Sequence, residues 1–165
     1  MADAPVFRLR GLMGSDIIHF HAHLEAIEVR CWLDDWYQQP RSLLELETVM
    51  FTGWACVWAI EVDGRFVGVS GFSELDKGRG VGRFFIVIGE TELWGKRLGG
   101  LVAADVIRRG FDELGLRKVV SDYLAPNVAS EQLHRRLGFV EEGVLRADSW
   151  RRGEYVDRVL LARFA

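Results

Sequence analysis

The chain has 165 residues, of which 49% are hydrophobic and 27% are charged, and its formal net charge is −3. This length fits one domain over residues 1–165, whose core needs no disulfide or metal, and the composition excludes collagen-like and fully disordered chains. No apolar run reaches the roughly 18 residues of a membrane span, and the acidic balance argues against a nucleic-acid partner. Because the first residues lack the apolar core of a secretion signal, we expect a reduced, cytoplasmic setting without membrane contact.

The first part of the chain predicts one strand, two helices and then three strands. Apolar and polar residues alternate at the start, and Ser15 or Asp16 is a suitable N-cap for the helix that follows. Later the residues become rich in Val, Trp and Ile, and Asp63-Gly64 is a hairpin turn signal. The expected ranges are strand 6–13, helix 15–32, helix 42–50, and strands 55–62, 65–75 and 81–88.

The second part predicts a long helix and then alternating short elements. An apolar stripe at helical spacing follows Gly95, and Gly115 is a helix stop. The expected ranges are helix 96–114, strand 117–124, helix 128–137, and strands 139–146 and 155–164. This order predicts an α/β fold whose sheet is antiparallel at first, with helical crossovers that join parallel neighbours in the middle.

The segment from Val81 to Gly100 predicts an anion site. A strand leads into a glycine-containing turn and then into a helix, so unpaired N–H groups and the positive end of the helix dipole point at the turn. Lys96 and Arg97 add positive charge there. Neither a Walker A loop nor a G-x-G-x-x-G motif is present, and the same pattern also occurs in α/β proteins for packing alone.

Four segments in a fixed order identify a family. They are IGETELWGKRLG at 88–99, FDELGL at 111–116, NVASEQLHRRLGFVEEGVLR at 127–146 and GEYVD at 153–157. With them, nearly the whole chain resembles the GCN5-related N-acetyltransferase (GNAT) superfamily, closest to its RimJ/RimL-type branch. The resemblance implies a strongly bent mixed sheet of about seven strands, splayed central parallel strands and about four flanking helices. It also implies direct acetyl transfer from acetyl-CoA to a primary amine, with no metal.

The resemblance assigns cofactor contacts to three parts of the chain. The backbone of the central strand would pair with the pantetheine arm, the glycine turn would hold the pyrophosphate, and an Asn would contact the arm. These residues are Ile86, Val87 and Ile88 on the strand, Lys96, Arg97, Leu98, Gly99 and Gly100 in the turn, and Asn127. Arg97 replaces the first glycine of the family's phosphate motif, so it either pairs with a phosphate or blocks its approach.

Catalytic roles by resemblance fall on Asp122, His134 and Ser130. His134 stands where the family usually has a tyrosine acid, and Ser130 is a second donor candidate on the same helix. Asp122 stands where related enzymes carry a base. The alternatives are a carboxylate paired with an arginine, a packed helix histidine and a capping serine. Backbone N–H groups near Val87 or Ile88 would stabilise the oxyanion.

The acceptor is less constrained by the sequence. Trp32, Trp36 and Tyr37 are candidates for a substrate pocket, or else core or dimer contacts. The branch includes enzymes for protein N-terminal α-amines and for amino sugars, polyamines and amine antibiotics. We therefore expect a peptide or small-molecule amine as acceptor, and the aromatic surplus favours a homodimer. A non-catalytic acyl-CoA-binding module and a dimerising scaffold are the alternative functions.

Overall fold

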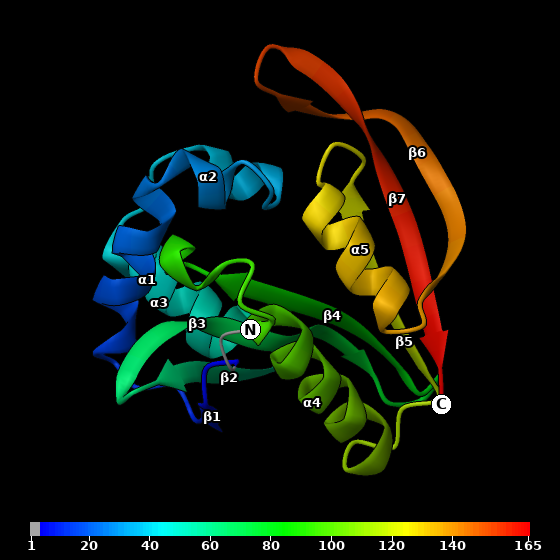
Figure 1. The fold of residues 1–165 in the computed structure, drawn as a ribbon, viewed down its shortest axis with the longest axis horizontal. Helices are drawn as coiled ribbons and strands as arrows, with labels where there is room; N and C mark the ends of the chain where they lie inside the picture. Colours follow the sequence, from blue (N-terminus) through cyan, green and yellow to red (C-terminus); the bar gives the residue numbers. More distant parts are fainter. Residues whose placement is uncertain (1–3) are drawn as a thin grey trace.

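The computed structural model describes residues 4–165, which form one seven-stranded sheet with the order β1-β2-β3-β4-β5-β7-β6 (Figure 1). The strands are β1 Phe7–Arg10, β2 Cys56–Val62, β3 Arg65–Asp76, β4 Val81–Ile88, β5 Lys118–Leu124, β6 Val140–Arg151 and β7 Glu154–Phe164. Strands β1 to β4 are antiparallel, β4 and β5 are parallel, and β7 is antiparallel to both of its neighbours. The predicted α/β sheet with parallel neighbours in its middle is confirmed.

Five α-helices accompany the sheet within the described residues, one more than expected. They are α1 Asp16–Glu25, α2 Ile27–Arg30, α3 Leu43–Thr48, α4 Leu98–Asp112 and α5 Val128–Arg136. Single turns η1 Asp35–Gln38, η2 Val49–Gly53 and η3 Thr91–Leu93 complete the set. The prediction of one helix from Ser15 to Trp32 is wrong, because Ala26 has an extended backbone (ψ 117°) and no Gly or Pro marks that break. No helix in residues 4–165 is long and apolar enough to cross a membrane.

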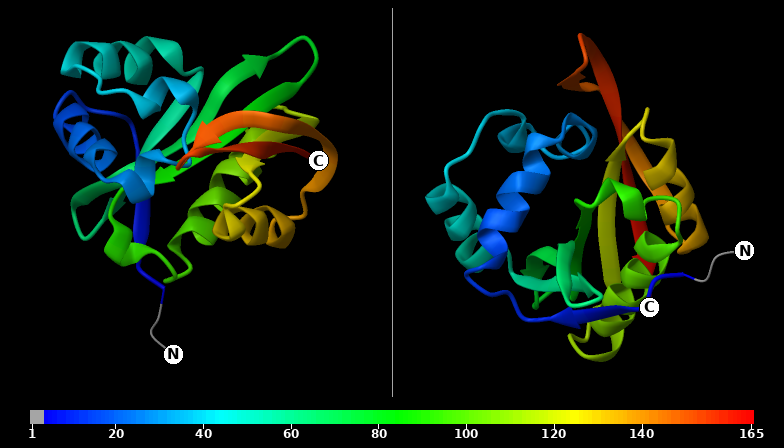
Figure 2. Two further views of the ribbon diagram at one scale, coloured as in Figure 1. Left: turned by 90° about the horizontal axis from the view of Figure 1, so that it is seen from above. Right: turned by 60° about the vertical axis from the view of Figure 1, so that its left-hand side comes forward.

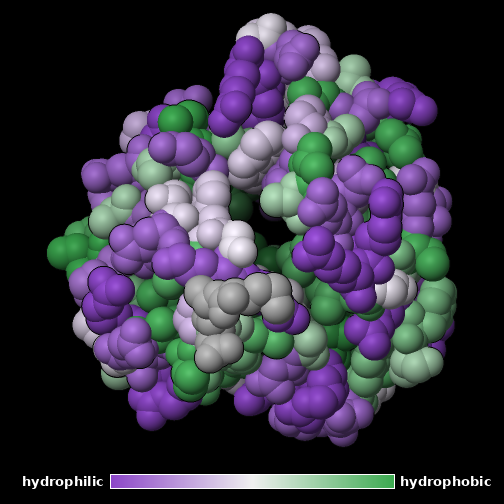
Figure 3. Space-filling view, in the orientation of Figure 1, coloured by the Kyte–Doolittle hydropathy of each residue, from purple (hydrophilic) through white to green (hydrophobic). Residues whose placement is uncertain are grey.

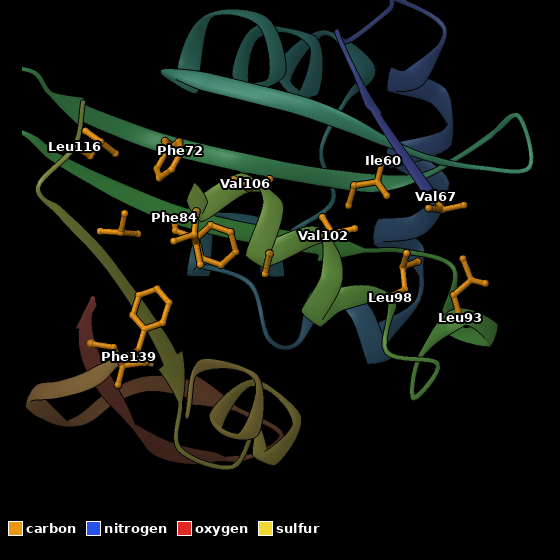
Figure 4. Packing of buried hydrophobic residues seen from close by; sticks show 14 of the residues in the cluster. Ile60, Val67, Phe72, Phe84, Leu93, Leu98, Val102, Val106, Leu116 and Phe139 are labelled. Atoms are coloured by element: carbon orange, nitrogen blue, oxygen red, sulfur yellow. The ribbon is translucent and has the colours of Figure 1, made fainter. Parts of the chain in front are cut away.

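Helices cover both faces of the sheet (Figure 2). Helix α4 packs its apolar stripe on one face, and helices α1 and α3 pack on the other. Each fully buried aliphatic or aromatic side chain contributes about 1.5–3 kcal/mol by leaving water, so these two clusters hold the helices in place. The first cluster includes Ile60, Phe72, Phe84, Val102 and Val106 (Figure 4), and the second includes Phe20, Leu46, Met50, Val69 and Val87.

The β2–β3 and β6–β7 hairpins differ in how well their ends were predicted. In the β2–β3 hairpin, Asp63 and Gly64 both have positive φ (50° and 74°), as the turn signal predicts. Strand β6 was expected to end at Arg146, but it continues to Arg151 after a bulge. There the carboxylate of Asp157 accepts hydrogen bonds from Arg146 and from the N–H of Ala147, at 2.6 and 2.8 Å. These contacts carry the chain through the bulge, and β6 and β7 form a long ribbon beside α5 (Figure 1).

Candidate active site

The parallel strands β4 and β5 separate partway along their length. They pair at three positions only, ending at Arg83 with Val120. Beyond this point β4 pairs only with β3, and Ser121 to Leu124 of β5 pair only with β7. The facing edges of the two strands therefore keep free N–H and C=O groups, which an extended ligand can pair with. The predicted splay of the central strands is confirmed.

A cavity of about 190 Å³ lies along this opening. Figure 3 shows the surface hollowed near its centre, with apolar residues at the bottom of the hollow. Most of the predicted site residues meet there although the chain separates them widely. From the predicted set, the cavity is lined by Trp32, Tyr37, Ile86, Val87, Asp122, Asn127, Ser130 and His134.

The N-terminus of α4 forms the glycine turn at the end of β4. Its first intrahelical hydrogen bond runs from the N–H of Leu101 to the carbonyl of Arg97 at 3.3 Å, so the N–H groups of residues 98–100 have no helical acceptor. A Cβ added to Gly99 would lie 3.6 Å from Ile88, which shows how closely this turn approaches β4. Such a turn can hold a diphosphate through its N–H groups and the helix dipole.

Arg97 is the N-cap of α4, with a left-handed backbone (φ 68°). Glycine, which the family motif has at this position, adopts this conformation without cost. An arginine there accepts backbone strain and places an additional cation at the turn. Trp94 secures the same segment, because its indole Nε1 donates to the carbonyl of Ile88 at 2.9 Å.

Asn127 caps α5, and its Oδ1 accepts a hydrogen bond from the N–H of Ser130 at 3.1 Å. The side-chain oxygen of Asn127 is thus used to cap the helix, and Asn127 also lines the cavity. Because Asn127 is the cap, the Ser130 hydroxyl is not needed for that task. It lies 3.3 Å from His134 Nδ1 instead.

His134 is buried against the sheet, with 4% of its surface exposed. Its Nδ1 lies 2.8 Å from the carbonyl oxygen of Ser130, and its Nε2 lies 2.8 Å from Ser121 Oγ. Its ring stacks on Tyr123 and meets Phe139 edge to face. Burial lowers the pKa of His134 below its ordinary value of 6.5, so the ring is neutral at pH 7. The acid role of His134 stays a prediction, and its packed position agrees with the alternative reading.

Asp122 follows Ser121 and lies on the other face of β5, away from His134. It forms ion pairs with Arg83 and Arg158. One carboxylate oxygen accepts from each guanidinium, and the Arg83 contact is 3.1 Å long. The arginine-paired alternative is therefore what the contacts show, and the role of base stays a prediction. The Arg158 guanidinium also contacts Asp34 and Asp148.

Of the three predicted acceptor residues, Trp32 and Tyr37 line the cavity and Trp36 does not. The ring of Trp36 lies under the guanidinium of Arg41, 4.3 Å from its centroid, and meets Tyr37 edge to face. Burial, with a smaller effect from Asp34, raises the pKa of Tyr37, so its hydroxyl stays protonated. The Tyr37 hydroxyl can therefore donate a hydrogen bond to a molecule bound in the cavity.

Two residues that sequence reasoning missed also line the cavity, Ser121 and Arg158. Arg158 follows Asp157 in the last motif, but nothing in the local pattern separates it from other surface arginines. Ser121 is one position before Asp122 and reads as an ordinary strand residue. Only the pairing of β5 with its neighbours places both side chains at the opening.

The model of the Acetyltransferase (GNAT) domain family matches residues 7–140. This chain belongs to that family. As a member of this acetyltransferase family it is an enzyme of the acyltransferase class, and its sheet shows the divided central strands that the resemblance implies.

Known proteins resemble this GNAT acetyltransferase in sequence or in structure. The SPbeta prophage-derived uncharacterized N-acetyltransferase YokL of Bacillus subtilis is 31% identical over 101 residues, which are 61% of this chain and 56% of that protein's length. Spermidine N-acetyltransferase from Vibrio cholerae, solved with CoA and spermine, superposes with a TM-score of 0.84 at 22% identity, covering 96% of this chain and 95% of that one.

A second solved structure is the ribosomal L7/L12 α-N-protein acetyltransferase RimL in complex with coenzyme A. Its TM-score is 0.79 at 20% identity, covering 96% of this chain and 93% of that one. At these identities the two structures establish the shared fold.

Proposed function

We propose that this GNAT acetyltransferase moves the acetyl group of acetyl-CoA to a primary amine by direct attack, without a covalent enzyme intermediate. The observation that carries the proposal is the opening between β4 and β5, with the α4 N-terminus beside its end. A free strand edge suits an extended amide-containing arm, and a helix N-terminus suits a diphosphate. The solved relatives with bound coenzyme A support the same assignment.

Each part of the site then has a task. The edge at Ile86 to Ile88 would pair with the pantetheine arm, and the turn from Lys96 to Gly100 would hold the diphosphate. Asn127 would contact the arm through its amide group. An N–H near Val87 or Ile88 would donate to the carbonyl oxygen as negative charge develops on it. Because the site holds amine and thioester side by side, much of the acceleration comes from their proximity.

Among amines, the site favours a weakly basic acceptor such as an α-amine. Asp34 and Asp122, the carboxylates on the cavity wall, both contact Arg158, so neither is free to take a proton from an ammonium group. An α-amine has a pKa of about 8 and is partly neutral near pH 7.5. A lysine-type amine has a pKa of about 10.4 and would need a base to remove its proton before attack. We therefore propose a peptide N-terminus as the first acceptor to test, and polyamines and amino sugars as the comparison.

The test is turnover measured by release of free CoA thiol. Wild-type protein is mixed with acetyl-CoA and, in parallel, an unblocked peptide, spermidine and glucosamine. Gly99→Glu places a carboxylate at the N-terminal turn of α4 and should weaken CoA binding at least about tenfold by charge repulsion and bulk. Gly14→Glu adds the same charge on an exposed loop with open space around the glycine and should leave binding unchanged.

The possible results separate the candidate functions. Thiol release with one of the amines, lost in Gly99→Glu and kept in Gly14→Glu, supports the proposal. CoA binding without release on the whole panel would favour the non-catalytic module. Absence of CoA binding by calorimetric titration would refute both functions.

A further inference from the structure

A chain of hydrogen bonds connects the opening between β4 and β5 to the interior of α5. The carbonyl oxygen of Ser130 can only accept, so the His134 Nδ1 that lies 2.8 Å from it carries the ring proton. In a neutral ring Nε2 is then the acceptor, and the hydroxyl 2.8 Å away, that of Ser121, is its donor. The order is thus Ser121 hydroxyl, His134 ring, Ser130 carbonyl.

Ser121 stands at the point where the two strands separate. The last β4–β5 pair joins Arg83 to Val120, and Ser121 is the next residue of β5. Its Oγ also lies 3.4 Å from the carbonyl oxygen of Phe84, across the start of the opening. Ser121 and His134 both line the cavity, although each is almost fully buried. A molecule in the opening therefore meets the Ser121 hydroxyl beside an imidazole whose two nitrogens already have partners.

We propose that Ser121 relays a proton between the reacting groups and His134. The relay rests on the acetyl transfer proposed above and adds a catalytic hydroxyl to it. It differs from the acid role predicted for His134 alone, because Nε2 is occupied by Ser121 and the proton on Nδ1 is held by Ser130.

The proposed step keeps atoms and electrons in balance. The amine nitrogen attacks the thioester carbonyl carbon, a C–N bond forms, and the carbonyl π electrons move to oxygen. The positively charged nitrogen gives a proton to Ser121 Oγ while the Ser121 proton moves to His134 Nε2. The intermediate then reforms its C=O bond, the C–S bond breaks, and its electron pair leaves on sulfur. The imidazolium returns its proton through Ser121 to the thiolate, which leaves as CoA thiol.

The surroundings of His134 suit this task. Burial keeps the imidazole neutral and able to accept a proton, while the hydrogen bond to Ser130 and the charge of Asp122 favour the imidazolium once it forms. The titratable group that faces the ring from β5 is Tyr123, which stacks on it, whereas Asp122 lies on the other face of the strand in its ion pairs and acts on the ring only through its charge. Arg135 and Arg136 follow on α5 and are exposed.

The test compares two buried serines. Ser121→Ala should lower kcat at least about 10²-fold, the usual contribution of a positioned proton-transfer group, without changing the Kd of CoA. Ser70→Ala is the matched control, because Ser70 is also buried and its hydroxyl donates to a β4 carbonyl, that of Phe85, at 2.8 Å. It should leave kcat within threefold. Ser121→Thr keeps the hydroxyl and should recover most of the rate.

The pH profile separates a relay from a merely structural hydroxyl. In the wild type, kcat should fall on the acid side as His134 becomes protonated, and this limb should disappear in Ser121→Ala. His134→Gln should lower kcat by a similar factor, and the double variant should lose little more than either single one. A loss below tenfold in Ser121→Ala, or an unchanged acid limb, would overturn the relay.

A measurement without turnover keeps the two proposals distinguishable. Nitrogen NMR of the His134 ring in the wild-type protein should show Nδ1 protonated and Nε2 accepting a hydrogen bond. A ring protonated at Nε2 overturns the relay even if the enzyme turns over. If no amine of the panel is acetylated, the proposed function fails and the relay fails with it. Turnover that is indifferent to Ser121 refutes the relay alone.

Discussion

The guanidinium of Arg151 donates to the backbone carbonyl of Leu33 at 2.8 Å, across 118 positions of sequence. The same buried group donates to the carbonyl of Cys31 and to the carboxylate of Asp35, at 2.9 and 2.7 Å. It therefore holds the segment between α2 and η1, which carries Trp32, against the β6–β7 ribbon. The wall of the cavity formed by Trp32 and Leu33 depends on this contact.

Replacing Arg151 should destabilise the segment from Cys31 to Asp35 that forms this wall. Arg151→Lys keeps the charge but cannot reach both carbonyls and the carboxylate, so buried polar groups lose their partners and the unfolding free energy should fall by about 2–4 kcal/mol. The KM for the acceptor should rise while the Kd of CoA stays constant. Urea unfolding and steady-state kinetics measure the two effects. Arg146→Lys, on the exposed part of the same strand, is the control and should shift stability by less than about 0.5 kcal/mol.

The left-handed backbone of Arg97 gives a second prediction. Arg97→Gly removes the steric cost of φ 68°, so the unfolding free energy should rise by up to about 1 kcal/mol. The same change removes a cation beside the α4 N-terminus, so CoA should bind several-fold more weakly at low salt, with the difference shrinking as salt is added. Asp63→Gly, in the β2–β3 turn with φ 50°, should leave CoA affinity unchanged. Tighter CoA binding by Arg97→Gly would mean that the arginine obstructs the diphosphate.

Asp122→Asn distinguishes an ion-pair partner from a catalytic base. Because both oxygens of Asp122 accept from arginines, the neutral amide should lower the unfolding free energy by about 1–3 kcal/mol and lower kcat less than tenfold. Asp105→Asn is a matched control, since Asp105 also pairs with two arginines but lies on α4. It should not change the KM for the acceptor. A hundredfold loss of kcat with unchanged stability would show that Asp122 is the base.

The buried imidazole of His134 makes stability depend on pH. Its pKa in the folded state lies below the ordinary 6.5, so the unfolded chain binds this proton more readily than the folded one. The free energy of unfolding that the neutral ring contributes is therefore fully present above about pH 6.5. It is lost as pH falls toward the folded pKa, at up to about 1.4 kcal/mol per pH unit. Urea unfolding between pH 5 and 8 should show this slope, reduced in His134→Gln. An equal slope in that variant would contradict the prediction.

Local pattern alone determined most of the elements. Strand β4 was expected over 81–88 and lies there, and the helix after Asn127 begins at Val128 as predicted. Periodicity and turn residues act over a few positions, so they can be read without knowing the fold. The same local signals led to the glycine turn before α4. They failed at Ala26, where helix α1 ends without a breaker residue, and at Arg146, where contacts with Asp157 carry the strand onward.

The sequence by itself thus determined the order of the strands, most of the helices and the family to which the chain belongs. Only the tertiary structure decided that Asp122 is held by Arg83 and Arg158, that Arg151 holds the segment from Cys31 to Asp35, and that Ser121 faces His134. These contacts join residues that lie far apart in the chain or on different elements. Their protonation and partners depend on burial, which arises only when the sheet and its helices pack together.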